Sequence, residues 1–565
     1  MTIRDATRAG RGREDEPPPL SASTAIIPQR VIPMAILLAA QTLVALGIIG
    51  AVPLHRPGWS GAAMGLAVAL IVMLPVRGGS LSHRAAQRLV FRYDSRRRGQ
   101  RRSDAFDTQL PGSAAMGFHW DRQLLMSVIR IDQDASAMTI MEPAAVVSGQ
   151  TIPLRLLAEC LRQFDVSLDS VDVIGRGVRL PGRNPIQAAY DAVLGPLPAI
   201  AARTVCVVIR VDPDRCPDAV RRRGGGWEGV LRTAATATSR VANRLVEAGL
   251  RCRVLGKAEI AELADELSAG LDPQEVQERW AACHQGRFEL RTFFLKPSMF
   301  TEAGLGQLWT VPTQATTVCL SLRREDRSDG VKLRGLVRFE TYGRVRARLD
   351  GLGELPGRQR AAWMSTLPVP PPRRPLRHWV FGRGLDSLVD LAVPASGCGQ
   401  LIGADELGRA VALPLFGPGV RRVEMCGTLH LAQQVVLRSV ALGARVRVNT
   451  SRPAAWHAMS EQIADHDLLD VNGHHVEPAA SDQPSHYGVE LFDGVAERRI
   501  PDTMTMVVVR PWHAQPTENA DVTLRLLDND RDLVRVDTHS GSAVVTMVAT
   551  DDEMRYIGSS FAMAG

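Results

Sequence analysis

Two aspartates that follow a predicted buried strand are the residues best suited to hold a metal. Asp212 and Asp214 come directly after Thr204–Val211, a nearly continuous β-branched run. Oxygen ligands at the end of a strand can hold a divalent cation, as they do in enzymes that transfer sugars from nucleotides. The motif is short and common, however, and a simple turn explains it without any chemistry. A membrane-anchored, glycosyltransferase-like enzyme using Asp212 and Asp214 is therefore only the alternative hypothesis.

The remaining candidate motifs are incomplete. The turn Cys426–His430 joins a predicted strand to a helix but lacks both the full glycine loop and the lysine of a P-loop. Gly256-Lys257-Ala258 has no serine or threonine after the lysine, so we interpret it as a strand-to-helix turn. His474-His475 is interpreted as a polar turn. Arg221–Arg223, before three glycines, could hold an anion, although a solvated turn is favoured. We expect no catalytic residue, no bound metal and no cofactor.

The cysteines indicate a reducing compartment. There are eight, at positions Cys160, Cys206, Cys216, Cys252, Cys283, Cys319, Cys398 and Cys426. They are scattered through the chain and none forms a C-x-x-C pair, which argues against a disulfide scaffold and a zinc finger. We expect them to be small buried side chains.

The basic character of the chain is confined to its first fifth. The 565 residues carry a net charge of +7, but residues 1–106 hold 15 arginines and six acidic residues, a net charge of +9. The rest holds 52 basic and 54 acidic residues, a net charge of −2. The body has no net basic field, so we expect no nucleic acid as a partner.

Two uncharged apolar runs lie in this basic region. Val31–Leu54 has 24 residues and Pro57–Val76 has 20, so each could span about 30 Å or more as a helix. The short linker between them predicts an antiparallel transmembrane hairpin. The small residues Gly47, Gly50, Gly61 and Gly65 would allow close helix contact. A signal peptide and a buried soluble hairpin are weaker alternatives.

The arginines predict an orientation and a contact surface. One arginine lies in the linker and nine follow the second run, which places both ends and the main body in the cytoplasm by the positive-inside rule. An amphipathic basic helix is predicted at Leu81–Tyr93, lying along anionic lipid headgroups. A solvated basic linker is the main alternative. The residues expected to contact the membrane surface or a partner are Arg84, Arg88, Arg92, Arg96, Arg97 and Arg98.

The sequence of the body predicts strand–helix–strand units. Thr204–Val211, the helix Trp227–Ala248 and Arg251–Leu255 predict a strand–helix–strand crossover in a parallel sheet. A second unit comprises Val420–Met425, a helix at Leu429–Leu442 and Ala444–Thr450. The predicted fold class is therefore an α/β region with mixed or parallel sheets, anchored by the hairpin.

Composition divides the chain into six segments. Five prolines mark the best internal boundary. The expected segments are a disordered N-terminus at 1–30, a transmembrane hairpin at 31–76, an Arg-rich juxtamembrane segment at 77–106, an α/β domain at 107–367, a Pro-rich linker at 368–376, and a C-terminal α/β domain at 377–565 resembling a P-loop fold without a P-loop.

Several segments together resemble a known family. The hairpin and basic strip are followed by Ile152–Val173, by Leu194–Pro198 leading into Thr204–Val211, and by Arg222–Gly226 leading into Val241–Gly249. In this order they resemble EccE, a membrane component of the actinobacterial type VII (ESX) secretion machinery, over roughly residues 31–340. The stretches Gly397–Gly403 and Pro453–Trp456 resemble the extension of its longer members.

The resemblance implies a role without chemistry. It implies a structural subunit of a large inner-membrane complex that supports export of small helical substrates of the WXG100 and PE/PPE types. The implied partners are EccB, the ATPase EccC and the many-span EccD. The family has no settled catalytic residues, so the resemblance transfers none to this chain.

Overall fold

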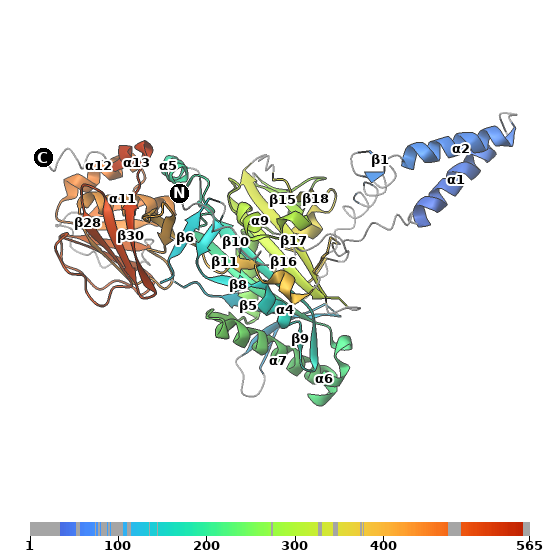
Figure 1. The fold of residues 1–565 in the computed structure, drawn as a ribbon, viewed down its shortest axis with the longest axis horizontal. Coiled ribbons are helices and arrows are strands. Elements are labelled where there is room, and N and C mark those ends of the chain that lie inside the picture. The colour runs from blue at the N-terminus through green and yellow to red at the C-terminus, as the bar shows by residue number, and fades with distance from the viewer. Residues whose placement is uncertain are drawn as a thin grey trace, which may run out of the picture.

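A computed structural model of the chain provides the structure. It describes residues 34–557, apart from 52, 54–56, 74, 77, 78, 81–87, 89, 90, 92–104, 110–114, 122, 135, 144, 183, 273, 274, 287, 326–329, 343–348, 373–375, 377, 383 and 473–487. Figure 1 shows two sheet-containing bodies side by side, with a helical hairpin at the opposite end from the second body.

The hairpin consists of two helices that pack against each other. Helix α1 is Met34–Ala51 and helix α2 is Gly58–Met73. They are 18 and 16 residues long, shorter than the apolar runs that predicted them. Among the described residues, no helix combines the length and the apolar character that crossing a membrane requires.

The first body is built on an antiparallel sheet. Each strand pairing that the structure describes in this sheet is antiparallel. The order along the sheet is β13 (Gln277–Glu278), β14 (Cys283–Gln285), β15 (Phe288–Leu295), β17 (Val331–Tyr342), β16 (Ala315–Arg324), β10 (Val166–Val178), β11 (Ala202–Val211), β5 (Leu125–Ile131), β4 (Met116–Trp120) and β3 (Ala105–Thr108). The long strands β10, β11, β16 and β17 form its buried centre.

The predicted parallel sheet in this body is wrong. Helix α7 (Gly226–Glu247) does carry the chain from β11 to β12 (Cys252–Val254). Both strands, however, pair with β5, and both pairings are antiparallel. The helical connection makes β11 and β12 run in the same direction. The earlier strand β5, however, lies between them. A strand–helix–strand pattern determines strand direction and not adjacency.

The second body confirms the prediction of a mixed sheet. The parallel part runs through β25 (Leu469–Asn472), β24 (Val446–Thr450), β26 (Val489–Asp493), β27 (Thr505–Arg510), β23 (Arg422–Cys426) and β28 (Val522–Asp528). Helix α11 (Leu429–Ala441) connects β23 to β24 as expected. The antiparallel part continues through β29 (Leu533–Thr538), β30 (Gly541–Met547), β21 (Gln400–Ala404) and β22 (Ala410–Leu413).

Segments from the first half of the chain take part in the second body. The hairpin of β6 (Thr139–Glu142) and β7 (Ala145–Ser148) adds to β22 at the edge of the second sheet. Helix α5 (Pro185–Leu194) packs into the second core, and its Tyr190 hydroxyl accepts a hydrogen bond from Leu401 N at 2.9 Å. These contacts connect the two bodies. The predicted division at 368–376 stays a prediction.

The cores contain the cysteines. All eight are free, and all except Cys252 are buried, which confirms that they are not disulfide-bonded. Burial raises the pKa of the Cys160 thiol to about 11 and that of Cys319 to about 12. These thiols are therefore uncharged and act as small apolar groups.

Candidate membrane-proximal interface

Glycines allow the two helices of the hairpin to pack closely. A Cβ built on Gly65 would lie 2.6 Å from the Leu43 carbonyl oxygen, and one built on Gly61 would overlap the Gly47 carbonyl oxygen. Only hydrogen fits at these positions, so the helix backbones approach closely. The predicted contact through Gly47, Gly61 and Gly65 is confirmed. The prediction for Gly50 is wrong, because a Cβ there would meet nothing within 4 Å.

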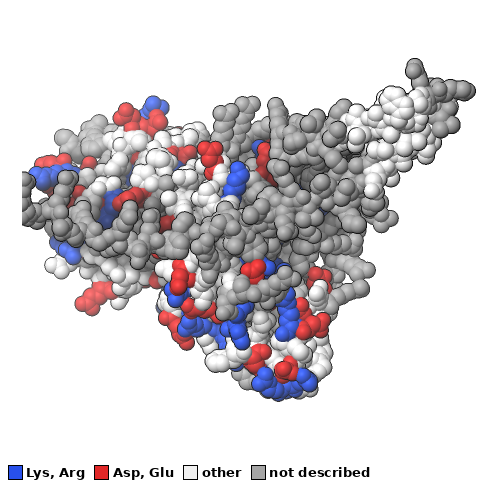
Figure 2. All heavy atoms as spheres, turned by 45° about the vertical axis from the view of Figure 1, so that its right-hand side comes forward, with Lys and Arg blue, Asp and Glu red and all other residues white. Residues whose placement is uncertain are grey.

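The outer surface of the hairpin is apolar. Its exposed large side chains are Leu46, Ile48, Ile49, Trp59, Met64, Leu66 and Val68. Figure 2 shows no charged side chain on the described part of the hairpin, whereas the lower end of the first body carries basic and acidic residues side by side. An apolar surface of this kind, separate from the two cores, marks an interaction site with lipid or with another apolar helix.

The basic strip reaches the first body through an aromatic contact. Of the predicted helix Leu81–Tyr93, the structure describes Arg88 and Phe91, both helical. The Arg88 guanidinium carbon lies 5.6 Å from the centre of the Trp280 ring, and Phe91 meets the same ring edge-on at 5.8 Å. Such an arginine–aromatic contact is worth about 0.5–1 kcal/mol at an exposed site. Arg88 and Phe91 therefore lie beside the β13–β14 edge of the first sheet.

The Trp280 side chain packs against Gly357. Gly357 donates a backbone hydrogen bond to the Trp280 carbonyl oxygen at 2.7 Å, and a Cβ on Gly357 would lie 2.8 Å from the indole. Gly357 also has φ +68, in the left-handed region that favours glycine. No sequence pattern marks Trp280, since neither its spacing nor its neighbours distinguish it. Arg84, Arg92, Arg96, Arg97 and Arg98 lie outside the described residues.

The aspartate pair forms a turn. Asp212 directly follows β11, and its Oδ1 accepts a hydrogen bond from the Asp214 backbone N–H at 3.1 Å at the start of the 3-10 turn Pro213–Arg215. Burial raises the pKa of Asp212. Within the described residues, no group of three or more His, Cys, Asp or Glu side chains is arranged to hold a metal ion. The geometry gives the enzyme hypothesis no support.

The arginines of the turn before the three glycines form ion pairs with aspartates of the same chain. Arg223 donates to Asp165 at 2.7 Å, and Arg221 pairs with Asp218. The hydrogen bond from Arg223 lowers the pKa of Asp165 to about 2. With their charges paired, these arginines do not form an open anion site.

The remaining turns match their sequence interpretation. At the start of α8 (Lys257–Ser268), the Lys257 backbone N–H donates to Asp107 at 2.7 Å. In the P-loop-like turn, Thr428 caps α11 by accepting from the Leu431 backbone N–H. Both helix starts are thus capped by side chains of this chain. His474-His475 lies outside the described residues.

A hydrogen-bonded cluster lies at the carboxyl ends of the parallel strands β24 and β26. Ligands of doubly wound sheets bind in this position. Here Asp493, at the end of β26, accepts hydrogen bonds from Arg452 at 2.7 Å, Trp456 at 2.8 Å and Thr450 at 2.9 Å. Burial alone would raise the pKa of Asp493, but the hydrogen bonds from Arg452 and Trp456 lower it. The Asp493 carboxylate is therefore bound by side chains of the same chain.

A family model matches one continuous stretch of the first body. The family model described as "Putative type VII ESX secretion system translocon, EccE" matches residues 199–295, from just before β11 to the end of β15. This stretch contains the aspartate turn, the basic turn and Trp280.

Individual relatives extend the similarity beyond this stretch. The chain is 28% identical over 277 residues to the ESX-5 secretion system protein EccE5 of Mycobacterium marinum, covering 47% of this chain and 67% of the relative. It is 26% identical over 395 residues to the ESX-1 secretion system protein EccE1 of Mycolicibacterium smegmatis, covering 69% of this chain and 76% of the relative. It is 25% identical over 322 residues to the ESX-2 secretion system protein EccE2 of Mycobacterium tuberculosis, covering 57% of each.

Proposed function

We propose that this chain, which belongs to the EccE family, is a structural subunit of the membrane complex of a type VII (ESX) secretion machine. The observation that carries the proposal is the similarity to ESX secretion proteins across 69% of the chain. The family is not a known enzyme family, and the candidate catalytic pair Asp212 and Asp214 forms a capped turn. The protein contributes surfaces to an assembly and catalyses no reaction.

The membrane-proximal part is the proposed assembly surface. The glycine-packed hairpin presents an apolar exterior, and Arg88 contacts Trp280 at the edge of the first body. Together they suit docking beside a many-span membrane subunit, of which EccD is the proposed example. EccB and the ATPase EccC are the other proposed partners, and anionic lipid headgroups are the proposed ligands of the arginines.

The experiment that tests this role is an affinity purification. The full chain is extracted from membranes in mild detergent, and the co-purifying proteins are identified by mass spectrometry. We expect the other ESX membrane subunits in constant proportion. Recovery of the chain alone, together with thermal stabilisation by a sugar nucleotide and a divalent metal, would replace this role with the glycosyltransferase-like alternative.

A matched pair of variants sharpens the same experiment. Gly61→Val places a side chain against the Gly47 carbonyl oxygen and should separate the helices, whereas Gly50→Val points into open space. We expect the Gly61 variant to lose most co-purifying subunits while the Gly50 variant keeps them. Equal recovery from both variants would exclude the hairpin from the assembly surface.

We further propose a two-pass topology with both ends and the main body in the cytoplasm. It is supported by the single arginine between the apolar runs, against nine after the second. A cysteine introduced at Gly58 should react with a membrane-impermeant maleimide on intact cells, and one introduced at Gly565 should react only after lysis. Labelling of the cysteine at position 565 on intact cells would contradict the proposed orientation.

A further inference from the structure

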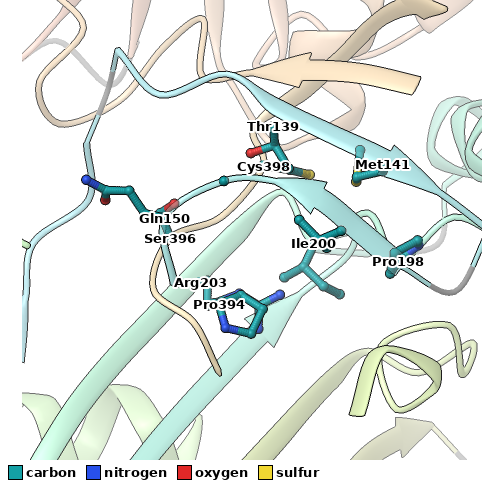
Figure 3. A pocket seen from close by; sticks show the side chains of 11 residues that line it. Thr139, Met141, Gln150, Pro198, Ile200, Arg203, Pro394, Ser396 and Cys398 are labelled. Carbon is teal, nitrogen blue, oxygen red and sulfur yellow. The ribbon is translucent and has the colours of Figure 1, made fainter. Parts of the chain in front are cut away.

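The pocket between the two bodies is too small for a ligand. Figure 3 shows its walls, which come from both bodies and include Arg203 and Gln150. It has room for about one water molecule, and the unpaired atoms of these two side chains have almost no exposure to solvent. This junction therefore provides no binding site, and the outer surface is where a partner can bind.

Phe164 is an exposed aromatic residue in a turn that favours glycine. It is the first of the two residues that join β9 (Arg162–Gln163) to β10, in which Val166 pairs with Gln163. Its φ is +52, and two-residue hairpins with a positive φ at this position usually have glycine there. A bulky side chain in the left-handed region is strained. The side chain is also 92% exposed, so burial does not offset the strain.

This combination indicates a role outside the fold. A single exposed apolar side chain is ordinary on a protein surface, but a glycine at position 164 would remove both the strain and the exposed ring. The Arg240 guanidinium on α7 lies 5.3 Å from the centre of the Phe164 ring and leaves most of the ring open. Strained residues concentrate at functional sites, and aromatic residues and arginines are the commonest anchors of protein interfaces.

The surroundings of Phe164 carry an excess of positive charge. Asp165, the second residue of the turn, is shared by three arginines: Arg223 at 2.7 Å, and Arg222 and Arg240 at 3.9 Å each. One carboxylate balances only one of these three guanidinium groups. The turn is closed to a small anion, but its summed charge attracts an acidic partner.

The neighbouring charges do not cancel this excess. Arg162 on β9 is exposed and adds a further positive charge. The ion pairs that flank the turn hold equal numbers of basic and acidic residues: Arg221 with Asp218, and Arg155 and Arg244 with Glu159 and Glu247. A surface with an exposed aromatic ring and unbalanced arginines is complementary to a segment that is both acidic and apolar.

The position of this surface favours a protein partner over a membrane. In Figure 1, β9 and α6 (Pro217–Arg222) lie at the lower end of the first body, away from helices α1 and α2. Figure 2 shows basic side chains gathered at this end, with acidic ones among them. A bilayer that the hairpin enters would therefore lie on another side of the body.

We propose that the Phe164 tip, formed by Phe164, Arg162, Arg222, Arg223 and Arg240, docks an acidic segment of another protein chain. The ring packs against an apolar side chain of that segment, and the arginines pair with its carboxylates. This surface is separate from the membrane-proximal surface. The proposal goes beyond the role in secretion and does not depend on which complex the chain joins.

Photo-crosslinking in cells that produce the full chain tests this proposal. p-Benzoylphenylalanine replaces Phe164 and, in a control, replaces Trp512 of the second body, which is 63% exposed. We expect position 164 to give one dominant protein adduct, mapped by mass spectrometry to a segment in which Asp and Glu outnumber Lys and Arg. No adduct at position 164, an adduct with lipid, a segment without acidic excess, or the same adduct from position 512 would each overturn the proposal.

Charge reversal tests the contribution of the arginines. Arg162→Glu combined with Arg222→Glu should lower the adduct yield from position 164 at least about fivefold, because like charges then face the acidic segment. The matched control is Arg531→Glu with Arg555→Glu, two arginines of the second body whose side chains are 81% and 77% exposed. We expect the control to leave the yield unchanged. Equal yields from the two double variants would contradict the charge complementarity.

Phe164→Gly separates a binding role from a structural one. Glycine relieves the strain at φ +52 and removes a side chain that is almost fully exposed. The midpoint of thermal unfolding should therefore equal or exceed that of the wild-type chain. A midpoint lowered by several degrees would show that Phe164 serves the fold, and it would overturn the proposal.

Discussion

Reversing Arg84, Arg88 and Arg92 to glutamate is expected to abolish recovery of the secretion complex and to lower substrate export by about tenfold or more. Each basic residue near an anionic leaflet contributes about 1 kcal/mol, so losing three weakens membrane attraction by about 3 kcal/mol before repulsion is added. Arg88 would also lose its contact with Trp280. The measurement is export and co-purification at matched protein levels.

Two comparisons interpret that result. Asp212→Ala combined with Asp214→Ala should leave export unchanged, because this pair only forms a turn. Trp280→Leu removes the aromatic contact but keeps every charge. Substrate export by this variant therefore separates the effect of the contact with the first body from the effect of attraction to lipid. Normal export by the arginine variant and failure of the aspartate variant would favour the enzyme hypothesis instead.

Replacing Arg438 with methionine is expected to cost about 3–5 kcal/mol in the free energy of unfolding. Arg438 on α11 and Glu553 on α13 (Asp551–Ile557) are each 1% exposed in their side chains. The guanidinium donates to both Glu553 carboxylate oxygens, at 2.8 and 2.9 Å, and its Nη1 donates to the Leu401 carbonyl oxygen at 2.9 Å. Without Arg438, a carboxylate remains buried with no counter-charge.

Chemical unfolding of the full chain measures this loss. The double variant Arg438→Met, Glu553→Met should recover much of the stability, because neither charge is then left alone. Arg535→Met breaks the exposed pair with Asp537, whose side chains are 50% and 41% exposed, and should cost below about 1 kcal/mol. A cost for Arg438→Met that is no larger than for Arg535→Met would contradict the buried ion pair.

Local patterns predicted the elements of the second body well. The strand at Val420–Met425, the helix at Leu429–Leu442 and the strand at Ala444–Thr450 are found as β23, α11 and β24, within about two residues at their ends. Hydrophobic periodicity and a capping threonine are local signals, so the sequence is sufficient to find them. The incomplete P-loop of the same unit could also be recognised from the sequence, because the absence of its lysine is visible in the motif itself.

Long-range neighbours were not readable in this way. Trp280 receives Arg88 and Phe91 from almost 200 residues earlier in the chain, and no pattern around it shows this. Arg203, in β11, is 4% exposed, and its Nε and Nη1 atoms have no hydrogen-bond partner. No local pattern shows this, because the Trp309 ring that covers the guanidinium comes from a distant part of the sequence.

The sequence by itself determined the apolar runs, the basic strip, the direction of each strand–helix–strand unit and the lack of a complete catalytic motif. Only the tertiary structure decided which strands are neighbours: β5 lies between β11 and β12, and the β6–β7 hairpin joins the second sheet. The physical reason is that periodicity depends on residues a few positions apart, whereas strand adjacency and the pairing of buried charges depend on contacts between segments that the chain brings together only on folding.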